Sequence, residues 1–155
     1  MSVVIKFKRL RQSAQLPVYQ TQHAAGMDLA ADVSDTVFVA PHERRAIPTG
    51  LTIEIPPGYE GQVRPRSGLA RNKGVTVLNS PGTIDSDYRG ELQVILVNLG
   101  SDSFVIQRGM RIAQLVIAPT EHAELVELTS LDATERDAGG FGSTGNATNI
   151  VDKRY

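Results

Sequence analysis

The sequence predicts an all-β domain, a jelly-roll-like β-barrel or sandwich of many short strands with at most one short helix. Its apolar residues recur mostly at every second position in short runs. Within Thr49–Ile55, for example, leucine and isoleucine alternate with threonine and glutamate. Turn-forming residues separate the runs: the chain has 14 glycines and eight prolines, and no segment has long helical periodicity. Short strands at such spacing are typical of sandwiches, barrels and jelly rolls.

Each expected element follows from one such run. In Arg111–Ile117, the alternation places Gln114 on the same face as Ile112 and Val116. Glu91–Leu99 has apolar residues on both faces, as a strand buried on two sides does. The other expected elements are strands at Val3–Phe7, Thr36–Val39, Thr49–Ile55, Val75–Leu78, Ser103–Ile106 and Glu124–Leu128, and one short helix, in the Ser67–Asn72 region or near Thr129–Glu135.

The length of 155 residues fits a single domain, and the composition changes only near its end. From Asp137 onward the chain is rich in Gly, Ser, Thr and Asn, as a flexible arm is. We therefore expect one domain over residues 1–155, with a β core at 1–135 and a C-terminal arm at 136–155. A frayed terminus is the simpler explanation, but Phe141, flanked by glycines, has no use in a solvated tail.

Charge and composition exclude several classes of function. With 16 Lys+Arg against 17 Asp+Glu, the formal net charge of −1 argues against a broad basic surface for nucleic acid. No apolar run approaches the ~18 residues that span a bilayer. The absence of cysteine removes disulfides and thiolate metal sites. Basic residues from Lys6 to Arg11 occupy the place where a signal peptide needs its apolar stretch. We expect a cytoplasmic protein without a nucleic-acid or membrane partner.

Two segments have the residue types of an anion site. At 25–31, Asp28 lies between apolar residues; it either starts a strand with an Asx-type turn, or orders a metal-bound water or an arginine. The segment 64–71 contains three arginines, Ser67 and Gly68. If Ser67 opens a helix, its hydroxyl caps the first N–H groups, which form an anion site with the arginine forks. The alternative is a capped helix with a solvated basic face.

Two further segments combine polar groups with tight turns. In 79–90, the amide of Asn79 could read a base edge, Asp85 could take a proton from water, and Tyr88 follows three residues later. An ordinary hairpin, in which Asp and Gly serve the turn, explains the same residues. In 136–145, glycines beside hydroxyls suggest a phosphate-binding loop, although no Gly-Lys-Ser/Thr follows as in a Walker motif.

Together and in this order, the segments resemble the five motifs of the trimeric deoxyuridine triphosphate nucleotidohydrolase (dUTPase) family. The counterparts are AGMDLAA (25–31), PRSGLA (65–70), GTIDSDYRGE (82–91), RIAQLVI (111–117) and RDAGGFGSTG (136–145). The resemblance implies a homotrimer with active sites shared between subunits. It also implies Mg²⁺-assisted water attack on the α-phosphate of dUTP, which gives dUMP and pyrophosphate, keeps uracil out of DNA and supplies dUMP for thymidylate synthesis.

The resemblance also implies a role for each matching residue. Asp85 would activate the attacking water, Tyr88 would pack on the deoxyribose, and Asn79 would pair with uracil. Asp28 would order a water on Mg²⁺, which binds mainly through the substrate phosphates. One departure is Asp137, where the family usually has glycine. The other expected substrate-binding residues are Arg66, Ser67, Gly68 and Gln114 for phosphates, Gly82, Thr83 and Ile84 in the hairpin, and Arg136, Phe141, Gly142, Ser143 and Thr144 in the arm.

Two other functions compete with this interpretation. A dCTP deaminase, or a bifunctional relative, shares a related fold but needs a glutamate placed to activate water at the cytosine C4. Tyr88 and the glycine-rich run in 139–145 favour a dUTPase instead. A non-catalytic jelly-roll module would have no need of Asp85.

Overall fold

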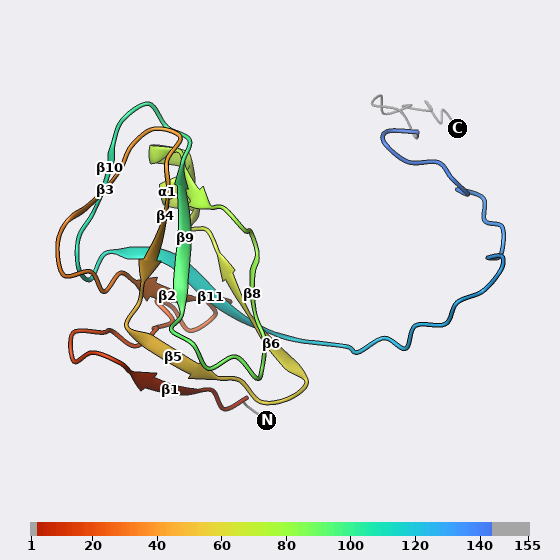
Figure 1. The fold of residues 1–155 in the computed structure, drawn as a ribbon, viewed down its shortest axis with the longest axis horizontal. Helices are drawn as coiled ribbons and strands as arrows, with labels where there is room; N and C mark the ends of the chain where they lie inside the picture. The colour runs from red at the N-terminus through yellow and green to blue at the C-terminus, as the bar shows by residue number, and fades with distance from the viewer. Residues whose placement is uncertain (1–2, 144–155) are drawn as a thin grey trace, which may run out of the picture. The chain divides into compact units, whose positions relative to one another are not determined.

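The structure is a computed structural model that describes residues 3–143. The chain forms two units, Met1–Glu121 and His122–Tyr155. The described strands and helix, labelled in Figure 1, are β1 Lys6–Arg9, β2 Met27–Ala30, β3 Val37–Val39, β4 Arg44–Pro48, β5 Leu51–Glu54, β6 Tyr59–Arg64, α1 Ser67–Lys73, β7 Val75–Val77, β8 Gly82–Ile84, β9 Gln93–Asn98, β10 Phe104–Ile106 and β11 Arg111–Pro119.

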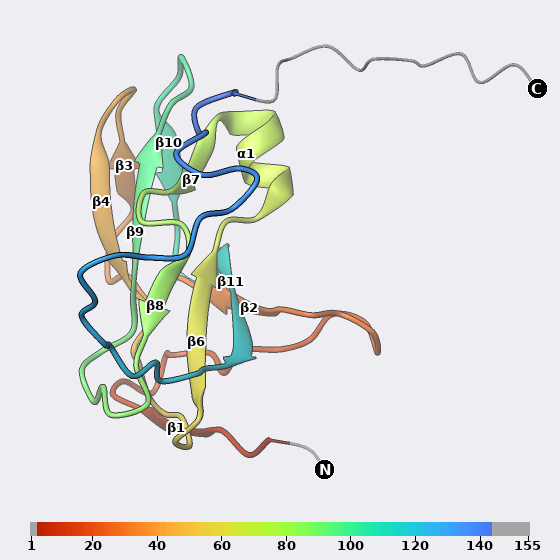
Figure 2. The same ribbon diagram turned by 90° about the vertical axis from the view of Figure 1, so that its right-hand side faces the viewer.

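The strands of the first unit pair antiparallel in two main sheets. The larger has the order β2-β11-β6-β8 and the smaller β4-β9-β7, while β1-β5 and β10-β3 form two-stranded pairs. Figure 2 shows β8, β6 and β11 side by side, with β4 and β9 in a second layer. Leu29 and Leu115 of the larger sheet and Ile47 and Leu96 of the smaller belong to one buried cluster. The predicted all-β sandwich with one short helix is therefore observed, and the described strands do not close into a barrel.

A β-bulge in β11 changes the face on which one predicted residue lies. Arg111 pairs with Ala30 and Ala113 with Leu29, so Ile112 is an extra residue in the strand. Both Ile112 and Ala113 are buried. The prediction that Ile112 shares a face with Gln114 is therefore wrong, because simple alternation cannot anticipate the additional residue.

Most of the expected strands are present, with two kinds of error. The expected strand at Glu124–Leu128 is absent, since these residues are exposed and unpaired in the described chain. Conversely, β4, β6 and β8 were not among the expected strands, and β2 forms where a strand start was one of two alternatives for 25–31. In β6 the buried position 61 is a glycine, where a Cβ would lie 3.0 Å from Cδ1 of Ile55. The Ile55 side chain thus fills the space that an apolar side chain at position 61 would take, so the sequence of β6 lacks the apolar alternation that predicts a strand.

The helix forms at the first of the two expected places, and Thr129–Glu135 is not helical. Arg66, with extended φ and ψ, is the N-cap, and no side chain makes a capping hydrogen bond. The prediction that the Ser67 hydroxyl caps the helix is therefore wrong, because Ser67 is already its first residue. The helix ends at Gly74, whose left-handed φ of 66° lets its N–H donate to the carbonyls of Ala70 and Leu69.

The second unit contains turns but no strand or helix between residues 122 and 143. Gly139 N–H donates to the Arg136 carbonyl at 2.8 Å, and Ser143 N–H donates to that of Gly140 at 3.0 Å. The unit begins at His122, earlier than the expected arm at 136. The organisation of residues 1–155 as one domain stays a prediction.

Candidate functional site

The register of the large sheet brings three polar side chains to one face. Gln114 of β11 lies opposite Asp28 of β2 on one side and Arg64 of β6 on the other. Residues directly opposite each other in an antiparallel pair point to the same face. Two positions before Arg64, Gln62 pairs with Thr83 of β8, so Thr83 belongs to this face too. The opposite face contains buried Leu29 and Leu115 and packs into the core.

Two arginines hold the carboxylate of Asp28 on this face. Nε of Arg66 lies 3.2 Å from Oδ1, and Nη1 of Arg111 donates to Oδ2 at 2.9 Å. The Asp28 side chain is only 13% exposed, which strengthens both interactions. Two guanidinium groups against one carboxylate leave one positive charge in excess. The cluster can therefore accept an anion, and its two cations are already oriented.

Two further hydrogen bonds fix the segment that leads into α1. Arg66 donates through Nη1 to the Arg111 carbonyl at 3.0 Å, and Gln114 donates through Nε2 to the Pro65 carbonyl at 3.0 Å. Oε1 of Gln114 packs against Gly26, where a Cβ would lie 2.4 Å away. The first, second and fourth sequence motifs thus meet at one place.

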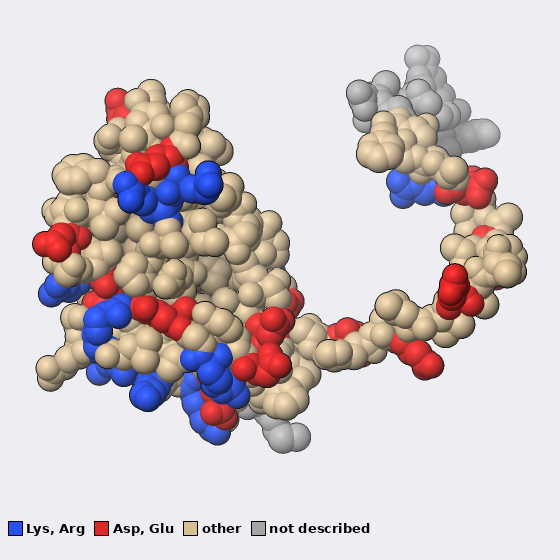
Figure 3. Space-filling view, in the orientation of Figure 1, with Lys and Arg blue, Asp and Glu red and all other residues tan. Residues whose placement is uncertain are grey.

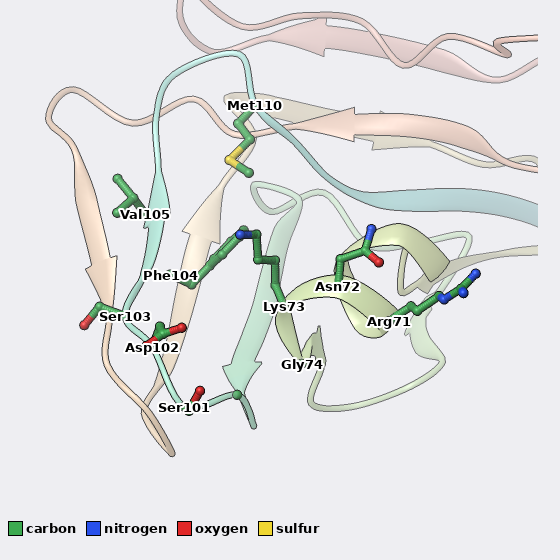
Figure 4. A pocket seen from close by; sticks show the side chains of 11 residues that line it. Arg71, Asn72, Lys73, Gly74, Ser101, Asp102, Ser103, Phe104, Val105 and Met110 are labelled. Atoms are coloured by element: carbon green, nitrogen blue, oxygen red, sulfur yellow. The ribbon is translucent and has the colours of Figure 1, made fainter.

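A cavity of about 370 Å³ opens beside this cluster. At Gly68 an added Cβ would meet nothing within 4 Å, so packing within the described chain does not require a glycine there. The residues that line the cavity are Gln20, Ala24, Gly26, Asp28, Arg66, Ser67, Gly68, Arg111 and Gln114. A larger cavity of about 520 Å³, shown in Figure 4, lies at the other end of α1, where Lys73 and Phe104 are among its walls. It contains none of the expected site residues.

The third motif forms a second group at the other edge of the same sheet. Gly82 of β8 pairs with Val63 of β6, and a Cβ at position 82 would lie 3.0 Å from Nδ2 of Asn79. The glycine therefore makes room for the Asn79 amide. Thr83 is exposed and Ile84 half-buried. The hairpin thus presents Asn79 at its turn and Thr83 on the open face.

Asp85 and Tyr88 follow the hairpin strand and are both exposed. Tyr88 N–H donates to the Asp85 carbonyl at 3.2 Å, which closes a turn between them. The Tyr88 hydroxyl donates to the Glu91 carbonyl at 3.0 Å. A Cβ on Gly90 would lie 2.3 Å from that hydroxyl, so only glycine lets the phenol take this position. Among residues 3–143, no side chain forms an ion pair with the Asp85 carboxylate.

The two groups are separated within one chain. Asp28 lies on β2 at one edge of the sheet and the hairpin on β8 at the other, with β11 and β6 between them (Figure 2). Three strand spacings amount to about 14 Å. A single chain therefore presents a cationic half-site and a hairpin half-site at opposite edges of one face.

The expected arm residues lie in the second unit. Nε of Arg136 donates to the Gly139 carbonyl at 2.8 Å, and Phe141 is fully exposed. Asp137 has φ of 43°, in the left-handed region where glycine is favoured and aspartate is tolerated. Thr144 lies outside the described residues.

Three other kinds of binding feature bear on the partners of the described chain: a basic surface, a membrane-spanning helix and a cluster of metal ligands. On the face drawn in Figure 3, basic and acidic side chains of the first unit are intermixed. In the described part of the chain, no helix combines the length and apolar character that a membrane crossing requires. Within residues 3–143, no three His, Cys, Asp or Glu side chains gather as ligands for a metal.

A model of a protein family described as dUTPase matches residues 12–145, which include all five motifs. The chain belongs to the dUTPase family. The deoxyuridine 5'-triphosphate nucleotidohydrolase of Syntrophotalea carbinolica is 56% identical over 144 residues, which cover 93% of this chain and 98% of that protein. The enzyme of the same name from Methylocella silvestris is 58% identical over 149 residues, or 94% of this chain and 93% of that one.

Solved structures agree with this membership. A mutant of the Staphylococcus bacteriophage 80alpha dUTPase with dUpNHpp is 27% identical, with a TM-score of 0.84 over 92% of this dUTPase chain and 99% of the phage chain. The phage 80alpha dUTPase with dUPNHPP is 29% identical, with a TM-score of 0.80 and the same coverage. The expected family, jelly-roll-like fold and enzyme class of dUTP diphosphatase are confirmed.

Two residues of this dUTPase site, Arg111 and Gly26, were not predicted from the sequence. Arg111 lies within the fourth motif, but its contact with Asp28 depends on the bulge that follows it. Gly26 lies within the first motif, and its contact with Gln114 depends on strand pairing. A basic residue three positions before Gln114 was the only available signal for the first, and nothing in the sequence alone indicated the second.

Proposed function

We propose that this chain hydrolyses dUTP to dUMP and pyrophosphate by attack of water on the α-phosphate. The observation that carries the proposal is the placement, on one face of one sheet, of an oriented arginine cluster and a hairpin whose Asp85 forms no ion pair among residues 3–143. The first has the chemistry for a polyphosphate, and the second for a nucleoside and a water molecule. The assignment of roles to individual residues rests on this geometry together with the family motifs.

The arginine cluster would bind the phosphate chain. A triphosphate has three to four negative charges, and the cluster has one positive charge in excess around Asp28. Phosphate oxygens can accept hydrogen bonds from guanidinium N–H groups as carboxylates do. Ser67 and Gly68, both exposed beside Arg66, offer a hydroxyl and unobstructed backbone. Gln114, held at Pro65, completes this half-site.

The hairpin would hold the nucleoside and the attacking water. Asp85 can accept a proton from water while the water oxygen bonds to the α-phosphorus and the bond to the β-phosphate oxygen breaks. Pyrophosphate leaves with the electron pair of that bond. Tyr88, fixed over Gly90, would lie against the deoxyribose where a 2′-hydroxyl would clash. The amide of Asn79, with the backbone of Gly82, Thr83 and Ile84, would pair with uracil.

The active site would draw on more than one subunit of a homotrimer. The two half-sites of one chain lie about 14 Å apart across the sheet, which suits pairing of one chain's hairpin with another's arginines. The arm would bring Arg136, Phe141, Gly142, Ser143 and Thr144 to a neighbouring site. The segment 122–135, which precedes the arm, has exposed apolar side chains that a partner surface could cover. These are Leu125, Val126, Leu128 and Leu131.

The residues of the site fit a magnesium ion that arrives with the substrate. The described chain offers no cluster of three carboxylate or imidazole ligands, and Mg²⁺ commonly binds through substrate phosphates and waters. When bound, the ion would neutralise charge on the phosphates. Asp28 could contact one of its waters through a lone pair that its pairing with Arg66 and Arg111 leaves free.

A pyrophosphate-release assay with dUTP, dCTP, dTTP and UTP, with and without Mg²⁺, tests the proposal. We expect Mg²⁺-dependent turnover of dUTP and little turnover of the other three. Ammonia release from dCTP would show a deaminase, and no turnover of any nucleotide would show a non-catalytic module. The supply of dUMP for thymidylate synthesis and the cytoplasmic location remain predictions.

A further inference from the structure

Glu91, the residue to which Tyr88 is bonded, is held at both its backbone and its side chain. Its carbonyl accepts the hydrogen bond from the Tyr88 hydroxyl at 3.0 Å. Its carboxylate oxygen Oε1 accepts the Gly50 N–H at 2.9 Å and a further hydrogen bond from Nη2 of Arg11. Movement of the Glu91 backbone would displace the acceptor of the Tyr88 hydroxyl, and the two hydrogen bonds to the Glu91 carboxylate resist that movement.

Arg11 is itself anchored on a buried carboxylate. Its Nε lies 2.6 Å from Oδ2 of Asp32, whose side chain is only 3% exposed. Asp32 N–H donates in turn to the Pro48 carbonyl at 2.8 Å. Gly50 has φ of 70°, and a Cβ there would lie 2.3 Å from the same carboxylate oxygen. The Arg11 guanidinium thus bridges a rigid point after β2 and the residue that orients Tyr88.

Other contacts hold the backbone near Glu91, and these do not involve its side chain. The Thr52 hydroxyl donates to the Arg89 carbonyl at 2.9 Å, and Leu92 N–H donates to the Leu51 carbonyl at 2.7 Å. These bonds tie the segment to β5 on either side of Gly90 and Glu91. Without Arg11, the carboxylate would retain only the Gly50 N–H, and solvent would compete for it.

We propose that Arg11 is a positioning residue for sugar selection: by bridging Asp32 and Glu91 it fixes the carbonyl on which the Tyr88 hydroxyl rests. This inference rests on the proposed function, in which Tyr88 lies against the deoxyribose. Steric exclusion of a 2′-hydroxyl requires a rigid side chain, and a Tyr88 ring held to within about 0.5 Å of its position meets this requirement. Arg11 is 42% exposed and lies outside the core, so its bridging geometry rather than its burial accounts for this role.

The test measures kcat and KM for dUTP and UTP in the native chain and in the variant Arg11→Met. We expect the preference for dUTP over UTP, taken as the ratio of kcat/KM values, to fall about tenfold. The ammonium group of Arg11→Lys cannot bridge both carboxylates as a guanidinium does, so its ratio of kcat/KM values should lie between those of Arg11→Met and the native chain. Lys6→Met is the control, because it removes a different, exposed ion pair with Glu54 on the adjoining β1-β5 ladder and should leave the ratio unchanged.

Equal losses for dUTP and UTP in Arg11→Met, with the ratio intact, would overturn the inference and make Arg11 merely structural. If Arg11→Met fails to fold because Asp32 is left unpaired, Glu91→Gln tests the inference in its place. It keeps an acceptor for the Gly50 N–H but loses the charge opposite Arg11, and should lower the same ratio. Tyr88→Leu distinguishes failure of this inference from failure of the proposed function. If it lowers the ratio and the Arg11 and Glu91 variants do not, only this inference fails; if the native chain does not prefer dUTP, the proposed function fails with it.

Discussion

Gly26 and Gln114 meet so closely that a Cβ on Gly26 would lie 2.4 Å from Oε1 of the glutamine amide. The opposite end of that amide donates to the Pro65 carbonyl. Gly26→Ala should therefore displace the amide and raise the KM for dUTP about fivefold through loss of one hydrogen bond. Steady-state kinetics measures the effect. The double variant Gly26→Ala/Gln114→Ala removes the clash, so the two substitutions should be strongly non-additive; simple additivity would mean that the contact has no role.

Asp85 should matter for turnover and little for binding. We expect Asp85→Asn to lower kcat by 10²–10⁴-fold, as loss of a general base does, with the affinity for a non-hydrolysable dUTP analogue nearly unchanged. Calorimetric titration and the pyrophosphate assay provide the two measurements. Asp87→Asn, an exposed acid two positions later, is the matched control. A loss confined to affinity would remove Asp85 from the chemical step.

Asp28 can be tested as an organiser of Arg66 and Arg111 or as a contact to magnesium. Because both of its oxygens face guanidinium groups, Asp28→Asn should raise the KM for dUTP about tenfold. The Mg²⁺ concentration that gives half-maximal activity should stay the same. A variant whose main change is in that Mg²⁺ dependence would instead favour the expected water-mediated metal contact.

Asp32 should make the stability of the fold depend on acid pH. Burial alone would raise the pKa of its carboxyl, but the Ser13 hydroxyl and the Arg11 guanidinium more than offset this, so the pKa lies below its ordinary value of 3.8. A group with a lowered folded-state pKa stabilises the fold above its unfolded pKa, and this contribution is lost as pH falls through the folded value. Asp32→Asn should therefore lower the free energy of unfolding by about 2 kcal/mol at pH 7.

The difference between native chain and Asp32→Asn should shrink as pH falls below about 4, as urea titrations at several pH values would show. Glu54→Gln is a useful control. Hydrogen bonding to Lys6 lowers the pKa of Glu54 as well, but that pair is exposed and screened by solvent. A pH-independent difference for Asp32→Asn would contradict the account of the Arg11–Asp32 pair.

The arm should be needed for activity and not for the fold of the first unit. Deletion of residues 136–155 should preserve the far-ultraviolet circular dichroism of the β core and lower activity about 100-fold. Truncation after Gly145, which keeps the fifth motif, should retain most activity. An unfolded product from the longer deletion would assign the arm a structural role.

The sequence was sufficient for elements that show a clear alternation of apolar residues, such as β5, or a short apolar run, such as β10. It missed β6, because Gly61 stands where an apolar side chain would give the pattern, and a neighbouring isoleucine fills the space. Of the site, the motifs identified Asp28, Gln114 and Tyr88 as important. Their partners depend on register, on the bulge in β11 and on close approach at glycines, none of which leaves a periodic signal.

The central claim is that a hairpin from one chain and an arginine cluster from another form one dUTP-hydrolysing site. Mixing two inactive variants, Asp85→Asn and Arg66→Ala, tests it most directly. After subunit exchange, some sites would combine the intact Asp85 of one chain with the intact Arg66 of the other. The account predicts that pyrophosphate release from dUTP reappears in the mixture and is absent from either variant alone. No recovery in a mixture that native mass spectrometry shows to contain mixed oligomers would contradict it.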